Sequence, residues 1–391
     1  MASIKKRVLI LDGMWNKSLA AVRSFGRKGF YVAAGERTRL ATALFSKYCA
    51  RTFVYPSPTE KKEDFLECLE DELKEGDYDI VLPMELSTQM VLTDTLVRRR
   101  LCQFTRIPFA DSSLAEKVND KSFLMKYAET MKIRKPKTYF PDGMEQVADI
   151  AHKLQYPVLI KPRASSGSRG IVYVNDEKDL PSSFAKVHKN YPSPIIQEYI
   201  PRGGGAFGVG LLLNFASEVK ASFVYKRIRE YPVQGGPSTL RESVQRQDIR
   251  EIAESLLISL RWIGIAHVEF TIDPRDEKPK LLEVNPRFWG SLSLAIEAGV
   301  DFPYLLYRMA MEGDIDPVRD YRLGVQCRWL IPGDILHFIK NPNRFRLKPS
   351  FFDFSAKDDI ISRHDFFPVI GRLSSALTFF FDKEMKELLK R

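Results

Sequence analysis

Cysteine and long apolar runs are both scarce in this 391-residue sequence. Its four cysteines form neither a C-x-x-C pair nor a zinc-binding spacing, which argues against a disulfide scaffold and makes a reducing compartment the simplest environment. The apolar run Val8–Leu11 stops at Asp12, and no stretch approaches the roughly 20 apolar residues of a membrane span. The sequence therefore predicts a cytoplasmic protein without a transmembrane segment.

Several common motifs of nucleotide and hydrolase chemistry are also missing. The first turn, Asp12–Ser18, contains neither G-x-G-x-x-G nor a P-loop, and the chain has no G-x-S-x-G nucleophile motif. The net charge of +10 is spread out, because no basic block is longer than Arg98–Arg100. This distribution favours small anionic partners such as nucleotides, and it does not predict nucleic-acid binding.

The patterns that are present indicate several domains. A strand at Arg7–Leu11, a helix at Ser18–Gly29 and a strand at Phe30–Ala34 form a βαβ opening, which is typical of a doubly wound α/β domain. After this domain the pattern changes to mixed α+β. The predicted boundaries give four parts: residues 1–110, 111–198, 199–313 and 314–391.

The last part, 314–391, is aromatic and basic. Its aromatic clusters are Phe351–Phe354, Phe366–Pro368 and Phe379–Phe381, and Ser374–Arg391 is predicted to form an amphipathic helix. We expect these aromatic residues to cap the core of the preceding domain. Docking on a membrane surface or on a partner is the alternative.

A hairpin late in the chain gathers oxygen-bearing side chains. Strands at Ala266–Phe270 and Pro279–Arg287 flank a turn centred on Asp276, so Glu269 is expected opposite Glu283. Side chains alternate along a strand, which places Asn285 on the same face as Glu283. Two carboxylates and an amide oxygen suit a hard cation such as Mg²⁺. The alternative is a set of solvated polar residues on an open sheet face.

A second candidate feature lies between two earlier strands. Lys161 ends the first strand, and the small polar loop Arg163–Gly170 follows. Glycine lets backbone N–H groups approach an anion closely, and the lysine adds a positive charge that suits a phosphate. An ordinary surface loop is the alternative. The extended stretch Gln197–Ile200 and the glycine run before Ala206 are predicted to join two subdomains.

These features follow one order along the chain: Lys121, Lys161 with its loop, Gln197–Ile200, Glu269, and Glu283–Arg287. That order resembles the ATP-grasp superfamily, in particular the branch similar to carbamoyl phosphate synthase, biotin carboxylase and carboxylate–amine ligases. The likeness covers about Asp111–Glu312. It implies a small lobe with a lid at 111–198 and a large lobe with a metal site at 199–313. The doubly wound domain then precedes a two-lobed ATP-grasp domain, and 314–391 is a C-terminal extension.

The resemblance also implies roles for individual residues. The residues expected to bind ATP are Lys121, Lys161, the lid residues Ser165, Ser166, Gly167, Ser168 and Gly170, the hinge residues Gln197, Glu198, Tyr199 and Ile200, and Glu269 and Glu283. Glu269, Glu283 and Asn285 would hold two Mg²⁺ ions, or Mn²⁺. The catalytic set would be Arg287, Arg227 and Lys161, with Arg227 preferred over Arg229 as the cation near the γ-phosphate.

Two positions near the predicted site, the segment after the hinge and His267, are not given a role in binding. The family commonly has an acidic residue after the hinge that holds the ribose, whereas this chain has Arg202–Gly205 there, so the ribose contact is not assigned. His267 shares a strand face with Glu269, and we expect it to be a structural histidine.

The resemblance implies an ADP-forming ligase that activates a carboxylate as an acyl phosphate for attack by an amine. Its expected partners are a small-molecule carboxylate and amine, and a homodimer is compatible with it. Two alternatives stay open: a bicarbonate-using carboxylase or carbamoyl phosphate synthase-like enzyme, and a non-catalytic ATP-binding module. The substrate pocket is expected between the N-terminal domain, the loop Gly235–Thr239 and the C-terminal region.

Overall fold

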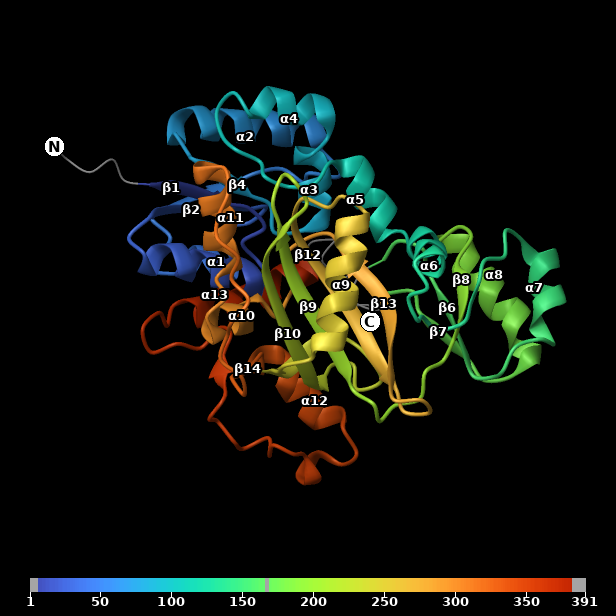
Figure 1. The fold of residues 1–391 in the computed structure, drawn as a ribbon. Helices are drawn as coiled ribbons and strands as arrows, with labels where there is room; N and C mark the ends of the chain where they lie inside the picture. The colour runs from blue at the N-terminus through green and yellow to red at the C-terminus, as the bar shows by residue number, and fades with distance from the viewer. Residues whose placement is uncertain (1–5, 166–168, 382–391) are drawn as a thin grey trace.

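The computed structural model describes residues 6–165 and 169–381, and its first domain is an α/β unit (Figure 1). Four parallel strands pair in the order β3-β2-β1-β4, which confirms the predicted doubly wound opening. The buried faces of β1, β2 and β4 carry aliphatic residues on both sides, as expected for a parallel sheet between helices. The elements of this domain are β1 (Arg7–Ile10), α1 (Asn16–Arg27), β2 (Tyr31–Glu36), η1 (Thr42–Phe45), β3 (Arg51–Val54), α2 (Lys62–Gly76), β4 (Ile80–Leu82), α3 (Leu86–Leu92) and α4 (Thr95–Leu101).

A smaller antiparallel unit follows, and in Figure 1 it projects from the rest of the molecule. Its four strands pair in the order β5-β8-β6-β7, and they share a separate apolar core with helices α7 and α8. Helices α5 (Ser112–Asn119) and α6 (Lys121–Thr130) lead into this unit, but their buried apolar residues belong to the apolar core of the larger sheet that follows. The elements of the unit itself are β5 (Thr138–Tyr139), α7 (Met144–Ala151), β6 (Val158–Lys161), β7 (Val172–Val174), η2 (Glu177–Asp179), α8 (Leu180–Asn190) and β8 (Ile195–Glu198).

The largest sheet has seven strands in the order β13-β12-β9-β10-β11-β14-β15. Helix α9 packs against strands β9 and β10, while α10 and α11 share one apolar core with the N-terminal domain. The elements are β9 (Ala206–Leu213), β10 (Val219–Glu230), β11 (Ser238–Ser243), α9 (Gln247–Ser259), β12 (Gly264–Asp273), β13 (Lys278–Asn285), α10 (Leu292–Ala298) and α11 (Phe302–Glu312). Together these sheets confirm the predicted mixed α/β and α+β architecture.

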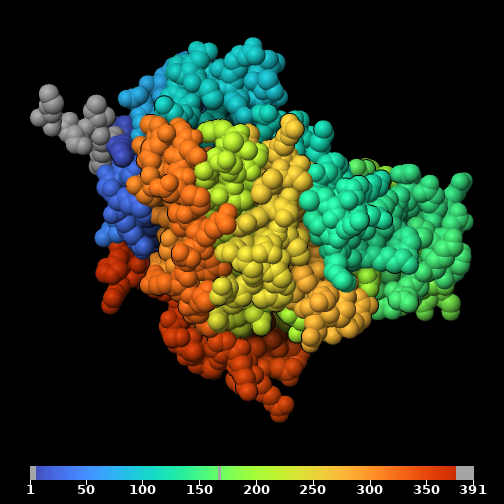
Figure 2. Space-filling view, viewed as in Figure 1, coloured from blue at the N-terminus to red at the C-terminus, as the bar shows by residue number. Residues whose placement is uncertain are grey.

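The C-terminal region continues the large sheet and then returns to the N-terminal domain. Strands β14 and β15 extend the sheet beyond β11, and helix α13 packs on η1. Figure 2 shows this region as part of the body of the molecule, below the strands and helices of the large sheet. The elements are β14 (Gln326–Arg328), η3 (Leu330–Asp334), α12 (Ile335–Lys340), η4 (Arg344–Arg346), β15 (Lys357–Asp358) and α13 (Pro368–Phe381).

The structure corrects the expectation for the C-terminal helix. It begins at Pro368 and not at Ser374, and a proline suits the first turn of a helix. Gly371 in that turn lies close to the ring of Phe45, which docks the start of the helix on the N-terminal domain. The rest of the predicted helix, residues 382–391, lies outside the described residues. Within the part of the chain that the structure describes, no helix combines the length and the apolar character needed to cross a membrane.

Candidate functional site

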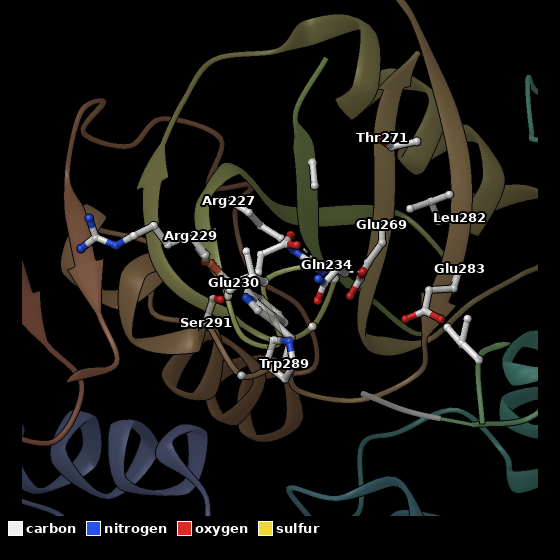
Figure 3. A pocket seen from close by; sticks show the side chains of 18 of the residues that line it. Arg227, Arg229, Glu230, Gln234, Glu269, Thr271, Leu282, Glu283, Trp289 and Ser291 are labelled. Atoms are coloured by element: carbon white, nitrogen blue, oxygen red, sulfur yellow. Dashed lines mark hydrogen bonds and ion pairs between the residues drawn. The ribbon is translucent and has the colours of Figure 1, made fainter. Parts of the chain in front are cut away.

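The hairpin β12–β13 forms the centre of the site. Its register pairs Glu269 with Glu283, as predicted, and His267 with Asn285, after a register shift between Glu269 and Phe270. The Asn285 amide nitrogen lies 3.2 Å from Glu269 Oε1 and 3.2 Å from Glu283 Oε1, so both carboxylates converge on one point. Figure 3 shows the two glutamates on neighbouring strands, facing the same cavity.

Positive side chains from both lobes surround the two carboxylates. Arg227, from β10, forms an ion pair with Glu269, and Lys121 Nζ from the start of α6 lies 3.1 Å from Glu283 Oε2. Burial on its own would raise the pKa of Glu283, but Lys121 and then Lys161 outweigh it and lower the pKa to about 2. Glu283 is therefore ionised at neutral pH, as a metal or cation ligand must be.

Glu269 experiences a different balance. Burial raises the pKa of Glu269, and the positive charge of Arg227 opposes that rise. The negative charge of the neighbouring Glu283 raises the pKa further. The two carboxylates thus repel each other across the hairpin. A further cation at their point of convergence would relieve that repulsion.

Lys161 lies at the end of β6 and points toward the same cavity as the carboxylates. Its ammonium donates to Gln197 Oε1 at 2.6 Å, and Gln197 is fixed in turn by a 3.0 Å bond to Thr138. Burial lowers the pKa of Lys161 to about 8, although Glu283 opposes that shift. The lysine therefore remains mostly protonated at pH 7, in a setting where an incoming anion would replace lost hydration.

The side chains of the predicted hinge, Gln197–Ile200, make structural contacts and also line the cavity. Gln197 is buried and holds Lys161, whereas Glu198 binds Arg275 and the backbone N–H of Lys137. The residues of the hinge and the following glycine run that line the cavity are Gln197, Glu198, Tyr199, Ile200, Pro201, Arg202, Gly203 and Gly205. The Arg202–Gly205 run thus adjoins the same cavity, but no acidic side chain in it takes the expected place of the ribose ligand.

Part of the predicted lid lies outside the described residues, namely Ser166, Gly167 and Ser168. On its near side, the carbonyl of Ser165 accepts a 3.1 Å hydrogen bond from Lys121 Nζ. On its far side, Gly170 has a φ of +72°, and a Cβ there would lie 2.7 Å from Tyr191 and Pro162. Only glycine suits both conditions at that position.

An aromatic stack forms the floor of the cavity behind the carboxylates. The ring of His267 lies between Tyr225 and Trp289, at centroid distances of 5.8 and 5.3 Å, and its Nε2 is 3.1 Å from the Tyr225 hydroxyl. Burial lowers the pKa of His267 well below its usual range, with Arg227 adding to the effect. These contacts support the interpretation of His267 as a neutral structural residue. Gly208 of β9 makes room for the stack, because a Cβ there would lie 2.4 Å from His267 Nε2.

The two candidate arginines of β10 have separate environments. Arg227 faces Glu269, whereas Arg229 is held in a buried bidentate pair with Asp334, at 2.8 and 2.7 Å. A register shift between the two residues in the β10–β11 pairing separates their directions. The geometry therefore supports the preference for Arg227 over Arg229.

Arg287 follows Asn285 at the end of the hairpin. Its Nη2 donates to Asn285 Oδ1 at 3.2 Å, and its Nη1 donates to the Phe288 carbonyl at 3.0 Å. The side chain is half-buried and lines the same cavity as Lys161 and Arg227. The sequence-predicted residues that the structure describes, except Gly170, therefore line one space of about 780 Å³.

The N-terminal domain contributes a pair of residues that sequence reasoning missed. Lys17 Nζ, in the first turn of α1, lies 2.6 Å from Glu85 Oε1 and donates to the Phe288 carbonyl at 3.1 Å. Burial lowers the pKa of Lys17 to about 8, while Glu85 opposes the change. Both residues follow the carboxyl ends of parallel strands, where ligands bind in open α/β sheets. That rule is the signal that could have identified them.

The C-terminal region also reaches the cavity. Residues from Trp329 to Arg372 contribute to its lining, together with the loop Gly235–Ser238 and the N-terminal Trp15–Lys17. The three walls expected for the substrate pocket are therefore found around one cavity.

Taken together, the antiparallel lobes, the facing carboxylates and the surrounding cations define the site of an ATP-grasp protein. The family described as "ATP-grasp domain" matches residues 118–291, which contain the small lobe, the hairpin and Arg287. The chain accordingly contains an ATP-grasp domain at residues 118–291, its sequence is similar to a carbamoyl phosphate synthase large chain, and its fold is similar to those of biotin carboxylase and L-amino acid ligase.

One curated relative and two solved structures define this likeness. The C-terminal section of the carbamoyl phosphate synthase large chain of Methanopyrus kandleri is 26% identical over 233 residues, which are 58% of this chain and 42% of the relative's length. The biotin carboxylase domain dimer of Hydrogenobacter thermophilus 2-oxoglutarate carboxylase, with MgADP and bicarbonate, is similar with a TM-score of 0.65 and 16% identity, covering 82% of this chain and 73% of that one. An L-amino acid ligase from Bacillus licheniformis has a TM-score of 0.58 and 18% identity, covering 80% and 78%. At these identities the solved structures show the shared fold.

Proposed function

We propose that this protein is an ATP-dependent carboxylate–amine ligase that forms ADP and passes through an acyl phosphate. The observation that carries the proposal is the convergence of Glu269 and Glu283 within a ring of four cations drawn from both lobes and the end of the hairpin: Lys121, Lys161, Arg227 and Arg287. Such an arrangement suits phosphoryl transfer, in which charge develops on oxygens and positioned cations supply most of the catalysis.

The donor set fits the divalent cations that this chemistry uses. Two ionisable carboxylates meet at the Asn285 amide, and a half-turn of that amide would present its oxygen to the same point. An all-oxygen set of this kind suits Mg²⁺, or Mn²⁺, better than a softer metal. Glu269, Glu283 and Asn285 would hold the ions, which when bound neutralise charge on the phosphate oxygens.

The protein groups have distinct tasks in this scheme. Lys161 and Lys121 bind phosphate oxygens from the small-lobe side, and Arg227 contacts the transferred γ-phosphoryl group from β10. Arg287 orients the substrate carboxylate, one of whose oxygens attacks phosphorus as the bond to ADP breaks. The amine then attacks the acyl carbon, inorganic phosphate leaves, and the amine nitrogen loses a proton. The hinge Gln197–Ile200 and the cavity-lining Gly203 and Gly205 hold the nucleoside.

A second candidate function is bicarbonate activation, as in a carboxylase or a carbamoyl phosphate synthase-like enzyme. The observation in its favour is the sequence similarity to a carbamoyl phosphate synthase large chain. Bicarbonate is itself a carboxylate, so the same cations serve both reactions. Release of ADP that depends on bicarbonate alone, without an added organic acid, would favour this candidate.

The deciding experiment is a screen for ADP release with pairs of acids and amines, ATP and Mg²⁺. Wild type should release ADP and phosphate only with the correct pair, Glu283→Ala should be inactive, and Lys161→Ala should show a raised KM for ATP. Glu277→Gln, at the exposed hairpin turn, is the matched control and should behave as wild type. Release of AMP and pyrophosphate would reject the proposed chemistry.

A further inference from the structure

The lining of the cavity includes two residues, Arg372 and Trp289, that each have a buried hydrogen-bond donor without an acceptor among the described residues. Arg372, on α13, is 8% exposed, and its Nη2 donates to the Met14 carbonyl at 3.3 Å and to the side chain of Asn16. Its Nε makes no hydrogen bond to any of the described residues, and neither does Nε1 of Trp289, which is 2% exposed. Both residues line the cavity. Because guanidinium and indole N–H groups can only donate, a ligand that completes them must supply acceptors.

The nearby protein acceptors are already engaged. Asp359 Oδ1 accepts from Arg241 and Ser293, and its Oδ2 accepts from Asn16 at 3.3 Å. Burial lowers the pKa of Arg372 to about 10, and Asp359 opposes that shift without contacting the guanidinium directly. Arg372 is therefore a buried cation at neutral pH, and it donates to neutral oxygens of Met14 and Asn16.

The cation at Arg372 is separate from the cations that serve the activated carboxylate. Arg287 donates to Asn285 Oδ1 and to the Phe288 carbonyl, whereas Arg372 donates to the Met14 carbonyl and to the side chain of Asn16, so different parts of the chain hold the two guanidinium groups. One cavity therefore holds two cationic centres. A substrate with a single carboxylate would engage only one of them.

The second centre is fixed in place by buried contacts of the C-terminal region. Arg23 of α1 binds Asp365 at 2.8 Å and donates to the carbonyls of Asp359 and Ile360. Gly371, next to Arg372, packs against the ring of Phe45. These contacts hold the arginine ready before any ligand arrives, which lowers the cost of binding.

We infer that Arg372 binds a carboxylate group other than the one that is activated, so that one of the two substrates carries a second anionic group. That substrate is either a diacid, which is activated at its other end, or an amino acid, which acts as the amine. The inference rests on the proposed ligase function and narrows its substrate class.

The test compares charged substrates with their neutral analogues. Acids are offered as diacids and as matched mono-amides, and amines as amino acids and as amino acid amides, to wild type, Arg372→Gln and Arg372→Lys. For the charged partner, Arg372→Gln should raise KM about 10- to 100-fold with little change in kcat, because one charge-assisted contact is lost. Arg372→Lys should restore part of the affinity. Arg363→Gln, which removes an exposed arginine nearby, is the control.

The pattern of KM changes identifies which substrate carries the second carboxylate. A KM that rises equally for charged and neutral analogues, or does not rise, overturns the inference while leaving the ligase function intact. Unchanged KM for ATP in Arg372→Gln shows that the variant is folded. If wild type releases no ADP with any pair, the ligase function fails. The binding site is then tested by calorimetric titration of the protein with succinate and, separately, with its diamide. Loss of succinate binding in Arg372→Gln supports the site, whereas equal succinate binding in wild type and Arg372→Gln, or no binding to wild type, overturns it.

Discussion

Replacing Glu283 by glutamine should destabilise the protein at neutral pH. Lys121 Nζ lies 3.1 Å from this carboxylate, and the lysine side chain is only 7% exposed. A pKa lowered from 4.5 to about 2 corresponds to about 3 kcal/mol of stability. Removing one partner of a buried ion pair costs about 3 to 5 kcal/mol, so both routes lead to the same size of effect.

The pH dependence of this loss has a defined sign. Because the pKa of Glu283 is lower in the folded protein than in the unfolded chain, its contribution is fully present above about pH 4.5 and is lost as the pH falls toward 2. The difference between wild type and Glu283→Gln should therefore be largest at pH 7 and should shrink below pH 4.5. Thermal unfolding without metal or nucleotide measures it, with a shift in Tm of about 2 to 4 °C per kcal/mol.

Lys121→Met provides the control for this interpretation. In the wild-type background it should also destabilise, because it leaves Glu283 without its nearest cation. In the Glu283→Gln background it should recover stability, because it removes an uncompensated buried charge. A Glu283→Gln protein as stable as wild type at pH 7, or a double variant less stable than either single variant, would refute the reasoning.

Three further predictions concern the metal ions, the aromatic stack and the C-terminal anchor. Chelation of divalent cations should abolish ADP release, and Mg²⁺ or Mn²⁺ should restore it, whereas Ca²⁺ should restore less because it prefers more ligands. Gly208→Ala should lower Tm by displacing His267 and Tyr225, at a cost of about 1 to 3 kcal/mol, and near-ultraviolet circular dichroism should report the disturbed stack. Asp334→Asn should destabilise by about 3 to 5 kcal/mol in chemical denaturation, because the buried Arg229 loses its counter-charge.

The hairpin was predictable because its geometry is local. Strand alternation and a turn centred on Asp276 predict Glu269 opposite Glu283, and the register contains that pair. The pair depends on a register shift between Glu269 and Phe270, because Phe270 pairs with Leu281, and the sequence did not predict that irregularity. The doubly wound opening was predictable because its βαβ pattern lies within 30 residues, from Arg7 to Glu36. In both cases the contacts join residues that are close in the sequence, so residue composition and the spacing of apolar residues were enough to predict them.

The separation of Arg227 from Arg229 shows where periodicity stops being informative. Strict alternation along a strand would place both arginines on one face. The irregular register at this point of β10 directs Arg229 to Asp334, a residue about 100 positions further on. No local pattern signals that contact, because the bulge is stabilised by tertiary packing.

The substrate end of the cavity depends still more on distant contacts. Lys17 and Glu85 come from the N-terminal domain, Arg287 from the hairpin and Arg372 from α13, so more than 350 residues separate the first from the last. The aromatic C-terminal region was expected to cap the preceding domain. Phe352, Phe354, Phe366 and Phe367 of its aromatic clusters are instead more than half exposed. The strands of the region extend the large sheet, and its helix docks on the N-terminal domain. A side chain such as Arg372 has no motif around it and becomes informative only once that docking is known.

The reaction chemistry and the substrate specificity of the protein are expected to depend on different parts of the chain. The proposed ATP and metal half of the site is built on one hairpin and one lobe, which lie within residues 118–291, where the ATP-grasp family matches. The proposed substrate half includes Arg372 of α13, and the buried pair Arg23–Asp365 ties the segment just before that helix to α1. Changes in the C-terminal region can therefore alter which acid or amine is accepted without moving Glu269 or Glu283. We therefore expect α13 to determine which substrates this protein accepts, and the β12–β13 hairpin to determine the class of reaction.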